Sequence, residues 1–456
     1  MTKVKYRPAA TAPETASLNR RILRLALPTF AALVAEPLFV LGDTAIVGHL
    51  GSGPLAGLSL GSTVIQTVVG LMIFLSYSTT PAVARAYGAA DYFAAYTAGK
   101  NGIWAAFFLG CLLSLAGYYT VEPVLQLLGA RGQTLSYASQ YLQPSLLGLP
   151  GMLIVLAAMG VLRGFQDTKT PLYLASAGAA ANLGLSWLLV YPGQLGLAGS
   201  ALATAIIQSL MGLILTAIVF AGARKHRVSF WLDAPGLLRV FKMGSWLMLR
   251  TLSMRCALLA TIFVVTQQGT VELAAYQLVM SFFVFLSFAL DSLAIAAQTL
   301  LGKELGRQDL ATTAGRKAIK LLKDQLVRWS LKCGSVTGLI CPLVGYGAAW
   351  IFTSDTQVQQ LFGLALLVVA CGQPLAAYVF VLDGVLIGAQ DMRYLCLAAL
   401  LTCLGYLPML LAVHQGFAGR GTSLGFILLW ISYAIGYMGL RALSLGWRAR
   451  QEQWIR

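Results

Sequence analysis

Ionisable side chains inside apolar stretches are the residues of this sequence with the clearest capacity for chemistry. They are Glu36, Asp43, Arg250, Arg255, Asp291 and Asp383. A charge at the centre of a lipid bilayer costs at least about 2.5–3.5 kcal/mol, so each is a functional candidate unless acids and bases simply pair to hold helices together. A carboxylic acid held away from water and from cations favours its protonated form, which suits it to carry a proton.

The depth of each residue follows from a rise of 1.5 Å per helical residue. Glu36, Arg255 and Asp291 each lie about 18–20 Å from the basic residue that bounds their apolar run on one side. Arg255 and Asp291 occupy successive runs at this common depth. They are therefore predicted to form an ion pair, with Arg250 as the alternative partner of Asp291.

Asp43 lies farther in, about 28 Å from the same side. No cation occurs at that depth in its half of the chain, so Asp43 is the candidate proton carrier. Asp383 lies near the basic end of its run and is expected to be solvated.

The composition identifies the environment that these residues share. Of the 456 residues, 58% are hydrophobic and 11% are charged, whereas soluble proteins contain about 25% charged residues. These values exclude a soluble enzyme and a disordered chain and indicate an all-α multi-pass membrane protein, because lipid cannot satisfy open backbone groups. Twelve apolar runs are predicted to span the membrane, at residues 23–48, 55–80, 96–120, 137–161, 171–191, 197–222, 243–266, 273–301, 330–352, 358–386, 394–413 and 422–446.

The basic residues indicate how these spans are oriented. Of the 32 Lys and Arg residues, 28 fall on the side that carries both tails, Arg131 and Arg420 fall on the other, and Arg250 and Arg255 lie within a span. Cytoplasmic loops of membrane proteins are enriched in Lys and Arg. Both termini are therefore predicted to be cytoplasmic, in a cell (plasma or inner) membrane. The same asymmetry accounts for the net charge of +16 without a nucleic-acid partner.

The chain contains an internal repeat. GSGPLAGLSL (51–60) matches GTVELAAYQL (269–278) at an offset of 218, and VLRGFQD (161–167) matches VLIGAQD (385–391) at an offset of 224. The two matches predict two six-helix lobes, residues 23–222 and 243–446, related by a parallel repeat whose axis runs along the membrane normal. Residues 1–22 and 447–456 are predicted to be cytoplasmic tails, and residues 223–242 a cytoplasmic linker. Repeated halves of this kind are typical of alternating-access transporters.

Several other classes of function find no support in the sequence. The seven cysteines form no CxxC pair and the three histidines are scattered, so neither a disulfide framework nor a metal site is predicted. No cofactor is expected, and the absence of a GxxxxGK[ST] loop argues against ATP as the direct energy source.

Several motifs resemble the multidrug and toxic compound extrusion (MATE) family. They are LGDTAIVGHLG (41–51), VLRGFQDTKTP (161–171) and GLAGSALAT (196–204). MLRTL (248–252) and ALDSLA (289–294) are similar to the branch named for DNA-damage-inducible protein F. The resemblance implies two six-helix lobes and export of small organic compounds, often cationic or amphipathic, against inward H⁺ or Na⁺.

The resemblance also implies roles for particular residues of the N-terminal lobe. Asp43 matches the proposed proton site, with Tyr141, Asn182 and Thr204 as its hydrogen-bonding partners. Ser186 stands where the family often carries an Asp, so H⁺ is the expected coupling ion and Na⁺ is disfavoured. Pro28 matches the family's kink-forming proline, and the region from Pro28 to Pro37 is where the first helix is expected to bend.

In the C-terminal lobe, Asp291 matches an acidic position of the branch, and Gln298 stands where some members carry a Glu. Ala376 replaces an Asp that another branch uses for Na⁺. Aromatic residues for binding flat or cationic compounds are expected among Phe39, Tyr141, Phe282, Phe283, Phe285 and Phe288.

Two alternatives to a proton-coupled exporter remain open at this level. One is a flippase of a lipid-linked precursor, for which a more cationic cavity would be expected. The other is a membrane-embedded transferase enzyme, which would need a cluster of His, Asp or Glu at an interface. No such cluster is visible, and a monomeric transporter in contact with membrane lipid is the expected form.

Overall fold

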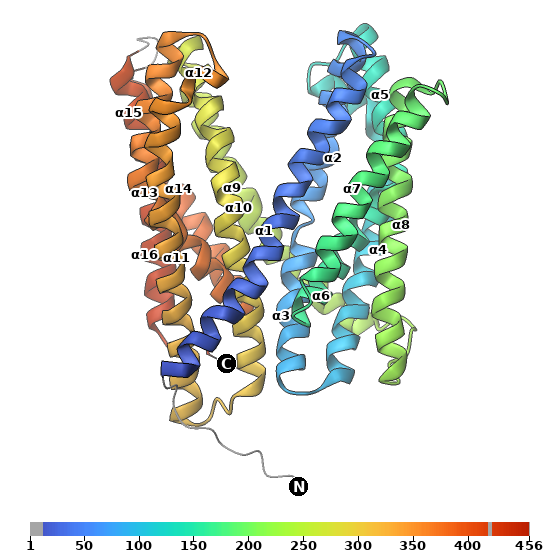
Figure 1. The fold of residues 1–456 in the computed structure, drawn as a ribbon, viewed down its shortest axis with the longest axis vertical. Helices are drawn as coiled ribbons and strands as arrows, with labels where there is room; N and C mark the ends of the chain where they lie inside the picture. Colours follow the sequence, from blue (N-terminus) through green and yellow to red (C-terminus); the bar gives the residue numbers. More distant parts are fainter. Residues whose placement is uncertain (1–11, 418–421, 456) are drawn as a thin grey trace. The chain divides into compact units, whose positions relative to one another are not determined.

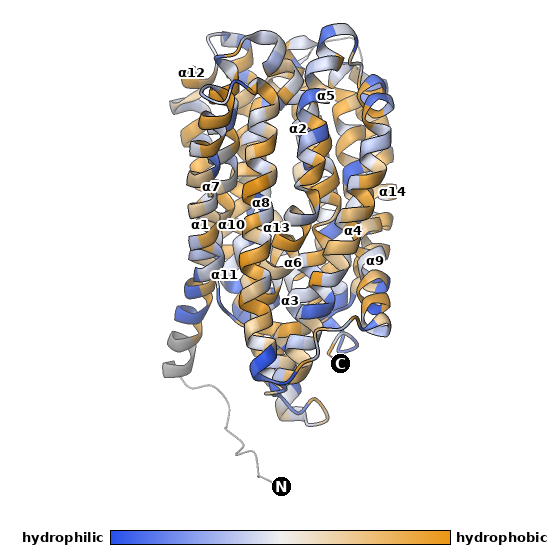
Figure 2. Ribbon diagram, turned by 90° about the vertical axis from the view of Figure 1, so that its right-hand side faces the viewer, coloured by the Kyte–Doolittle hydropathy of each residue, from blue (hydrophilic) through white to orange (hydrophobic). Residues whose placement is uncertain are grey.

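The computed structural model describes residues 12–417 and 422–455, and within these ranges the side chains of residues 12–17, 36, 38 and 39 are left out. The predictions for Glu36, Phe39 and Arg420 lie outside the described side chains. Within the described ranges the chain forms helices and no strand. Figure 2 shows hydrophobic residues along the helices and hydrophilic ones mainly towards their ends.

The described chain divides into two compact units, the N-terminal unit of residues 31–248 and the C-terminal unit of residues 12–30 and 249–455 (with the gap noted above). The helices of the first half are α1 (Ala12–Gly48), α2 (Ser52–Leu71), α3 (Phe74–Gly88), α4 (Tyr92–Leu127), α5 (Gly132–Leu147), α6 (Leu149–Gly164), α7 (Lys169–Val190) and α8 (Gly196–Lys225). Those of the second half are α9 (Ala234–Thr266), α10 (Thr270–Arg307), α11 (Thr313–Gly347), α12 (Ala349–Phe352), α13 (Thr356–Gly388), α14 (Met392–Phe417), α15 (Ser423–Ile431), the π-helix η1 (Ser432–Tyr437) and α16 (Met438–Arg450) (Figure 1).

These helices account for the twelve predicted spans. Ten helical segments of the described chain are long and apolar enough to cross a membrane, and the bent pair α5–α6 makes an eleventh. α11, with 35 residues and charged residues concentrated in its first half, is the twelfth. The prediction of an all-α membrane protein with twelve spans is confirmed.

The bend between α5 and α6 has a local cause. The two helices meet at an angle of 51° around Gly148, where Pro150 supplies no backbone N–H for a continuous helix. A Cβ at Gly151 would lie 2.6 Å from the Cα of Ser209 on α8. The glycine therefore allows two backbones to approach closely, as small residues do at helix interfaces in membranes.

The VLRGFQD and VLIGAQD segments adopt the same conformation. Gln166 and Gln390 have left-handed φ values of 66° and 61° at the ends of α6 and α13. The N–H of Asp167 donates to the carbonyl of Leu162 at 2.9 Å, and the N–H of Asp391 donates to Leu386 at 3.0 Å. Matching helix ends of this kind support the internal repeat.

The first helix contributes to both units. Asn19 accepts hydrogen bonds from Gln325 Nε2 at 2.8 Å and from Trp329 Nε1 at 2.6 Å, both on α11. These bonds place residues 12–30 with the C-terminal unit. The predicted lobes, residues 23–222 and 243–446, remain a prediction.

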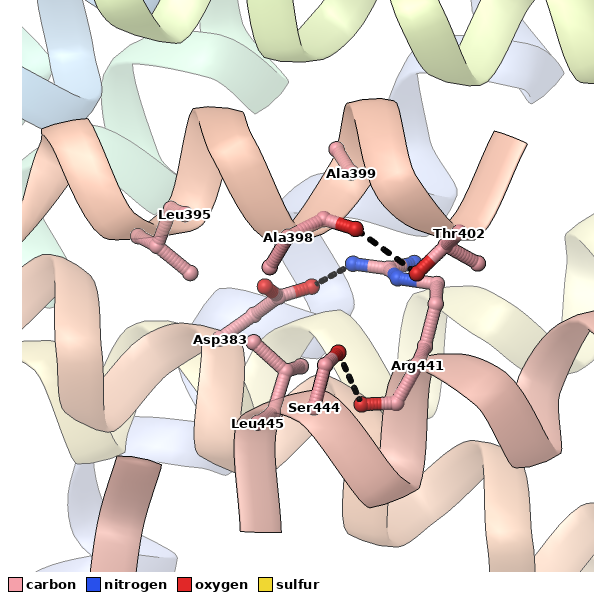
Figure 3. Close-up of a pocket in the computed structure, with 8 residues that line it drawn as sticks. All are labelled: Asp383, Leu395, Ala398, Ala399, Thr402, Arg441, Ser444 and Leu445. Carbon is pink, nitrogen blue, oxygen red and sulfur yellow. Dashed lines mark hydrogen bonds and ion pairs between the residues drawn. The ribbon is translucent and has the colours of Figure 1, made fainter. Parts of the chain in front are cut away.

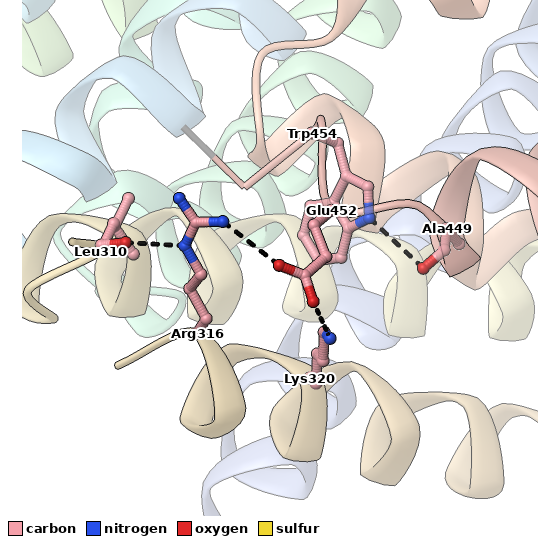
Figure 4. A network of polar contacts seen from close by, with 6 residues as sticks. All are labelled: Leu310, Arg316, Lys320, Ala449, Glu452 and Trp454. Atoms are coloured by element: carbon pink, nitrogen blue, oxygen red, sulfur yellow. Dashed lines mark hydrogen bonds and ion pairs between the residues drawn. The ribbon is translucent and has the colours of Figure 1, made fainter. Parts of the chain in front are cut away.

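The residues after α16 pack against α11. Glu452 forms ion pairs with Arg316, at 3.2 Å, and with Lys320 (Figure 4). Arg316 Nε also donates to the carbonyl of Leu310 at 2.8 Å. Trp454 is almost completely buried, and its indole N–H donates to Ala449 at 3.3 Å.

Removal of the Glu452 charge is expected to loosen this C-terminal segment. Hydrogen bonds from Lys320, and then Arg316, hold the pKa of Glu452 below its usual value. The ion pairs are therefore fully present above pH 4.5, the usual value, and are lost as the pH falls through the lowered pKa. Glu452→Gln is predicted to speed tryptic cleavage after Arg448 and Arg450 at neutral pH, measured on the purified full chain by mass spectrometry.

Asp324→Asn is the matched control, because Asp324 lies on α11 but pairs only with the neighbouring Lys323. Equal cleavage rates for Glu452→Gln and the wild-type chain would show that the segment is held without these ion pairs.

Candidate functional site

Asp43 lies in the N-terminal unit, where α1, α7 and α8 meet. Ser186 of α7 donates to Asp43 Oδ1 at 2.7 Å. Ser200 of α8 lies 2.9 Å from Oδ2 and 3.0 Å from Oδ1. The carboxyl group is buried, and among the described residues it forms no ion pair. Two neutral hydroxyl groups therefore satisfy it in place of a cation.

A second polar pair lies one helical turn away on the same two helices. Asn182 and Ser186 are four residues apart on α7, as are Ser200 and Thr204 on α8. Asn182 Nδ2 donates to Thr204 Oγ1 at 3.0 Å. The buried Oδ1 atom of Asn182 has no hydrogen-bond partner in the described chain.

The implied hydrogen-bonding partners of Asp43 therefore need correction. Asn182 and Thr204 bond to each other instead of to the carboxylate, and Ser186 and Ser200 take the role assigned to them. Tyr141 of α5 is buried and close enough to Asp43 for an electrostatic interaction, but no hydrogen bond joins the two in the described structure. Ser200 was missed, although its i,i+4 spacing to Thr204 repeats the spacing of Asn182 and Ser186.

Close helix packing brings these groups together. A Cβ at Gly199 would lie 2.8 Å from the carbonyl carbon of Leu189, so the glycine lets the start of α8 approach the end of α7. The Tyr191 hydroxyl donates to the carbonyl of Ile46 at 2.8 Å and fastens α7 to α1. A buried apolar cluster borders the site and comprises Val47, Leu58, Tyr141, Leu197 and Ala201.

Pro28 and Pro37 both lie within α1, which is assigned as one helix from Ala12 to Gly48. Their role in bending this helix remains a prediction.

The C-terminal unit contains a buried charge cluster. Arg250 of α9 pairs with Asp383 of α13 at 2.8 Å. Arg441 of α16 pairs with the same Oδ2 atom, and Figure 3 shows this second pair. All three residues are at least nine-tenths buried. Asp383 is thus held by two cations, in contrast to Asp43.

This cluster overturns the predicted pairing of Arg255 with Asp291. Arg255 is exposed, and no ion pair joins it to Asp291 in the described chain. Asp383 is buried instead of solvated, because α16 lies beside α13 and brings Arg441 to it. Asp291 is half-buried and close enough to interact electrostatically with Asp383, Arg250 and Arg441. Gln298 is buried on the same helix as Asp291.

Aromatic residues gather near this cluster around the π-helix η1. The rings of Tyr433 and Tyr437 stack with centroids 5.7 Å apart. Trp430 packs against Tyr276, and Tyr406 against Tyr437. Of the phenylalanines expected to form an aromatic wall, Phe283 contacts Tyr433, whereas Phe285 is exposed. No group of three His, Cys, Asp or Glu side chains suited to a metal ion occurs in the part of the chain that the structure describes.

Two groups of transmembrane helices with a repeated sequence motif and buried charges define a polytopic transporter. The model of the MatE family matches residues 28–188 and 247–412. The chain therefore belongs to this family and is a multidrug and toxin extrusion transporter, as the motifs implied.

Relatives of known name agree with this assignment. The chain is 29% identical to Protein DETOXIFICATION 44, chloroplastic, of Arabidopsis thaliana, over 96% of this chain and 83% of the relative. It is 26% identical to DNA damage-inducible protein F of Escherichia coli K12, over 95% and 92%. Because it belongs to the MatE family, the chain is a transporter and not a membrane-embedded transferase.

Solved structures show the same fold. The chain superposes on a mutant of the Vibrio cholerae MATE transporter VcmN with a TM-score of 0.84, at 22% identity, covering 97% of this chain and 99% of that one. It also superposes on a MOP superfamily transporter of Pyrococcus furiosus with a TM-score of 0.81, at 18% identity, covering 97% and 98%.

The charge cluster predicts a large stability loss for Asp383→Asn. The substitution leaves two buried guanidinium groups without a counter-charge, and breaking such a pair costs about 3–5 kcal/mol. Arg255→Gln, at an exposed position, is expected to change stability by less than about 0.5 kcal/mol. Thermal unfolding of the purified variants measures both effects. If Asp291→Asn destabilises the protein as much as Asp383→Asn, Asp291 is an equal member of the cluster.

Proposed function

We propose that this transporter exports small organic compounds, often cationic or amphipathic, in exchange for H⁺, with Asp43 as the residue that alternates between proton and substrate. The observation that carries the proposal is the Asp43 site, where Ser186 and Ser200 hold a buried carboxyl group and no cation of the described residues pairs with it. An acid without a permanent counter-charge is free to exchange its proton for a cationic ligand.

The two serines accommodate both charge states of Asp43. A hydroxyl group can donate to a carboxylate, and it can also rotate to accept a hydrogen bond from a carboxylic acid. Proton binding therefore leaves no buried polar group without a partner, which would otherwise cost about 1–3 kcal/mol. In the exchange, protonation neutralises the site and releases the cation, and loss of the proton restores substrate binding.

Na⁺ is the less favoured coupling ion. Among the described side chains, Asp43 is the one carboxylate of its site, and Ser186 stands where the family often has an acid. Asp383, in the C-terminal unit, is occupied by Arg250 and Arg441. Neither location offers a pair of free carboxylates to a metal ion.

We further propose that the protein resides in the cell membrane with both termini in the cytoplasm, as the distribution of Lys and Arg indicates.

Asp43→Asn is predicted to abolish ΔpH-driven transport while leaving the protein folded. The asparagine keeps the size of the side chain and its contacts with the two serines but cannot bind or release a proton. Efflux of a fluorescent organic cation from proteoliposomes, with ΔpH and Na⁺ gradients imposed separately, measures the effect. Full ΔpH-driven transport by this variant would refute the proton role of Asp43.

Ser186→Ala and Ser200→Ala are each predicted to reduce transport without abolishing it. A hydrogen bond to a charged group contributes about 1.5–3 kcal/mol. Loss of one donor should move the midpoint of the pH–transport profile upward by about 1–2 units. Thr204→Ala, one turn away, is the control and should leave the midpoint nearly unchanged. An equal shift in all three variants would show that Asp43 does not depend on its two direct partners.

The proposed orientation is tested with cysteines introduced into a cysteine-free variant. Arg131→Cys should react in intact cells with a thiol reagent that cannot cross membranes, because residue 131 is predicted to lie outside. Lys225→Cys should react only after the cells are opened. Both positions are exposed, so the contrast does not depend on burial. Labelling of Lys225→Cys in intact cells would reverse the topology.

A further inference from the structure

The segment between α8 and the first turns of α9 concentrates positive charge. Its five Lys and Arg residues are all exposed and form no ion pair among the described residues, namely Arg224, Lys225, Arg227, Arg239 and Lys242. The segment contains one acid, Asp233. That acid accepts hydrogen bonds from Asn101 Nδ2 at 2.9 Å and from the N–H of Gly236 at 3.2 Å. Asp233 therefore fixes the start of α9. It is close enough to Arg239 to interact electrostatically, but among the described residues it forms no ion pair with any of the five cations.

The same segment exposes large apolar side chains. Trp231 is 85% exposed, and Phe230, Leu232 and Leu238 are exposed beside it. Exposure of these side chains to water is unfavourable, and an exposed apolar patch rimmed by polar residues commonly marks an interaction site.

Three side chains of α4 bond to this segment, two of them to its backbone and Asn101 to the side chain of Asp233. The Nζ atom of Lys100 donates to the carbonyl of Trp231 at 2.9 Å, and Trp104 Nε1 donates to the carbonyl of Phe230 at 3.2 Å. Lys100 is only 4% exposed, and a buried ammonium group is tolerated only when it is well bonded. These bonds, together with that of Asn101, fix the main chain while the apolar side chains remain outside.

The segment also lies at the end of two membrane-spanning helices. α8 has 30 residues and α9 has 33, which correspond to about 45 and 50 Å. The hydrocarbon core of a bilayer is about 30 Å thick. Both helices are therefore long enough to reach the headgroup region even when they are tilted by about 20°. Trp is enriched in that region, and Lys and Arg are enriched in the cytoplasmic loops beside it.

We propose that residues 224–242 form a binding surface for anionic phospholipid headgroups. Trp231, Phe230, Leu232 and Leu238 insert at the boundary of the acyl chains, and the five cations bind the phosphate groups. Lys100, Asn101 and Trp104 are positioning residues that keep the surface formed. Charge complementarity favours an anionic lipid leaflet, and the exposed apolar residues favour lipid over a purely polar partner such as a nucleic acid.

The test compares lipid binding by two charge-matched triple variants of the full chain. Native mass spectrometry in detergent measures bound phosphatidylglycerol, with phosphatidylcholine of the same acyl chains as the neutral reference. Each cation is expected to contribute about five-fold to the affinity for phosphatidylglycerol. The triple variant Arg227→Gln/Arg239→Gln/Lys242→Gln should therefore bind this lipid about 100-fold more weakly. The control is Lys317→Gln/Arg328→Gln/Lys332→Gln, which removes three exposed cations from α11. If both triples weaken binding equally, or neither does, the proposal is overturned.

A second measurement locates the apolar contact. Brominated phosphatidylglycerol in vesicles should quench the fluorescence of the wild-type chain more than that of Trp231→Phe, and more than brominated phosphatidylcholine does. Lys100→Met should reduce the difference, because Trp231 would no longer be held in place. Equal quenching of the wild-type chain and Trp231→Phe would show that Trp231 does not contact lipid. A protein partner would then be the alternative occupant of the surface.

Discussion

The cost of placing a charge in lipid is the constraint on which the rest of this structure depends. The protein meets that cost in two different ways. In the N-terminal unit, Asp43 is held by two serine hydroxyl groups, which donate hydrogen bonds to its carboxyl oxygens. In the C-terminal unit, Asp383 is held by two arginines, whose opposite charges compensate it. The two sites thus differ in what compensates the buried charge, neutral hydroxyl groups in one and guanidinium groups in the other.

Much of the architecture could be predicted from the sequence because it depends on local quantities. Hydropathy is a property of each run of residues, and the twelve spans follow from it. The Gln-Asp turns at residues 166–167 and 390–391 could be recognised as a repeat because both end a helix through the same backbone conformation. Asp43 could be identified as a candidate because it lies in an apolar run with no cation at its depth.

The errors concern the direction in which a side chain points around its helix. Arg250 and Arg255 are five residues apart and so differ by about 140° around the axis of α9. Depth along the helix favoured Arg255, but only Arg250 faces α13 and reaches Asp383. Ser200 was missed for a related reason. Its approach to Asp43 depends on how closely α8 packs against α7, which Gly199 permits and which no single helix reveals.

The π-helix at residues 432–437 sets how the last membrane-spanning helix is rotated about its own axis. A π turn contains one residue more than an α turn, and each additional residue rotates everything beyond it by about 100°. The turn thus sets the angular offset between Trp430, which packs on Tyr276, and Arg441, which binds Asp383. Deletion of one residue within it would swing Arg441 away from its carboxylate while leaving the hydrophobicity of the span almost unchanged. The fit of this helix is therefore a matter of rotational register, which composition alone does not encode.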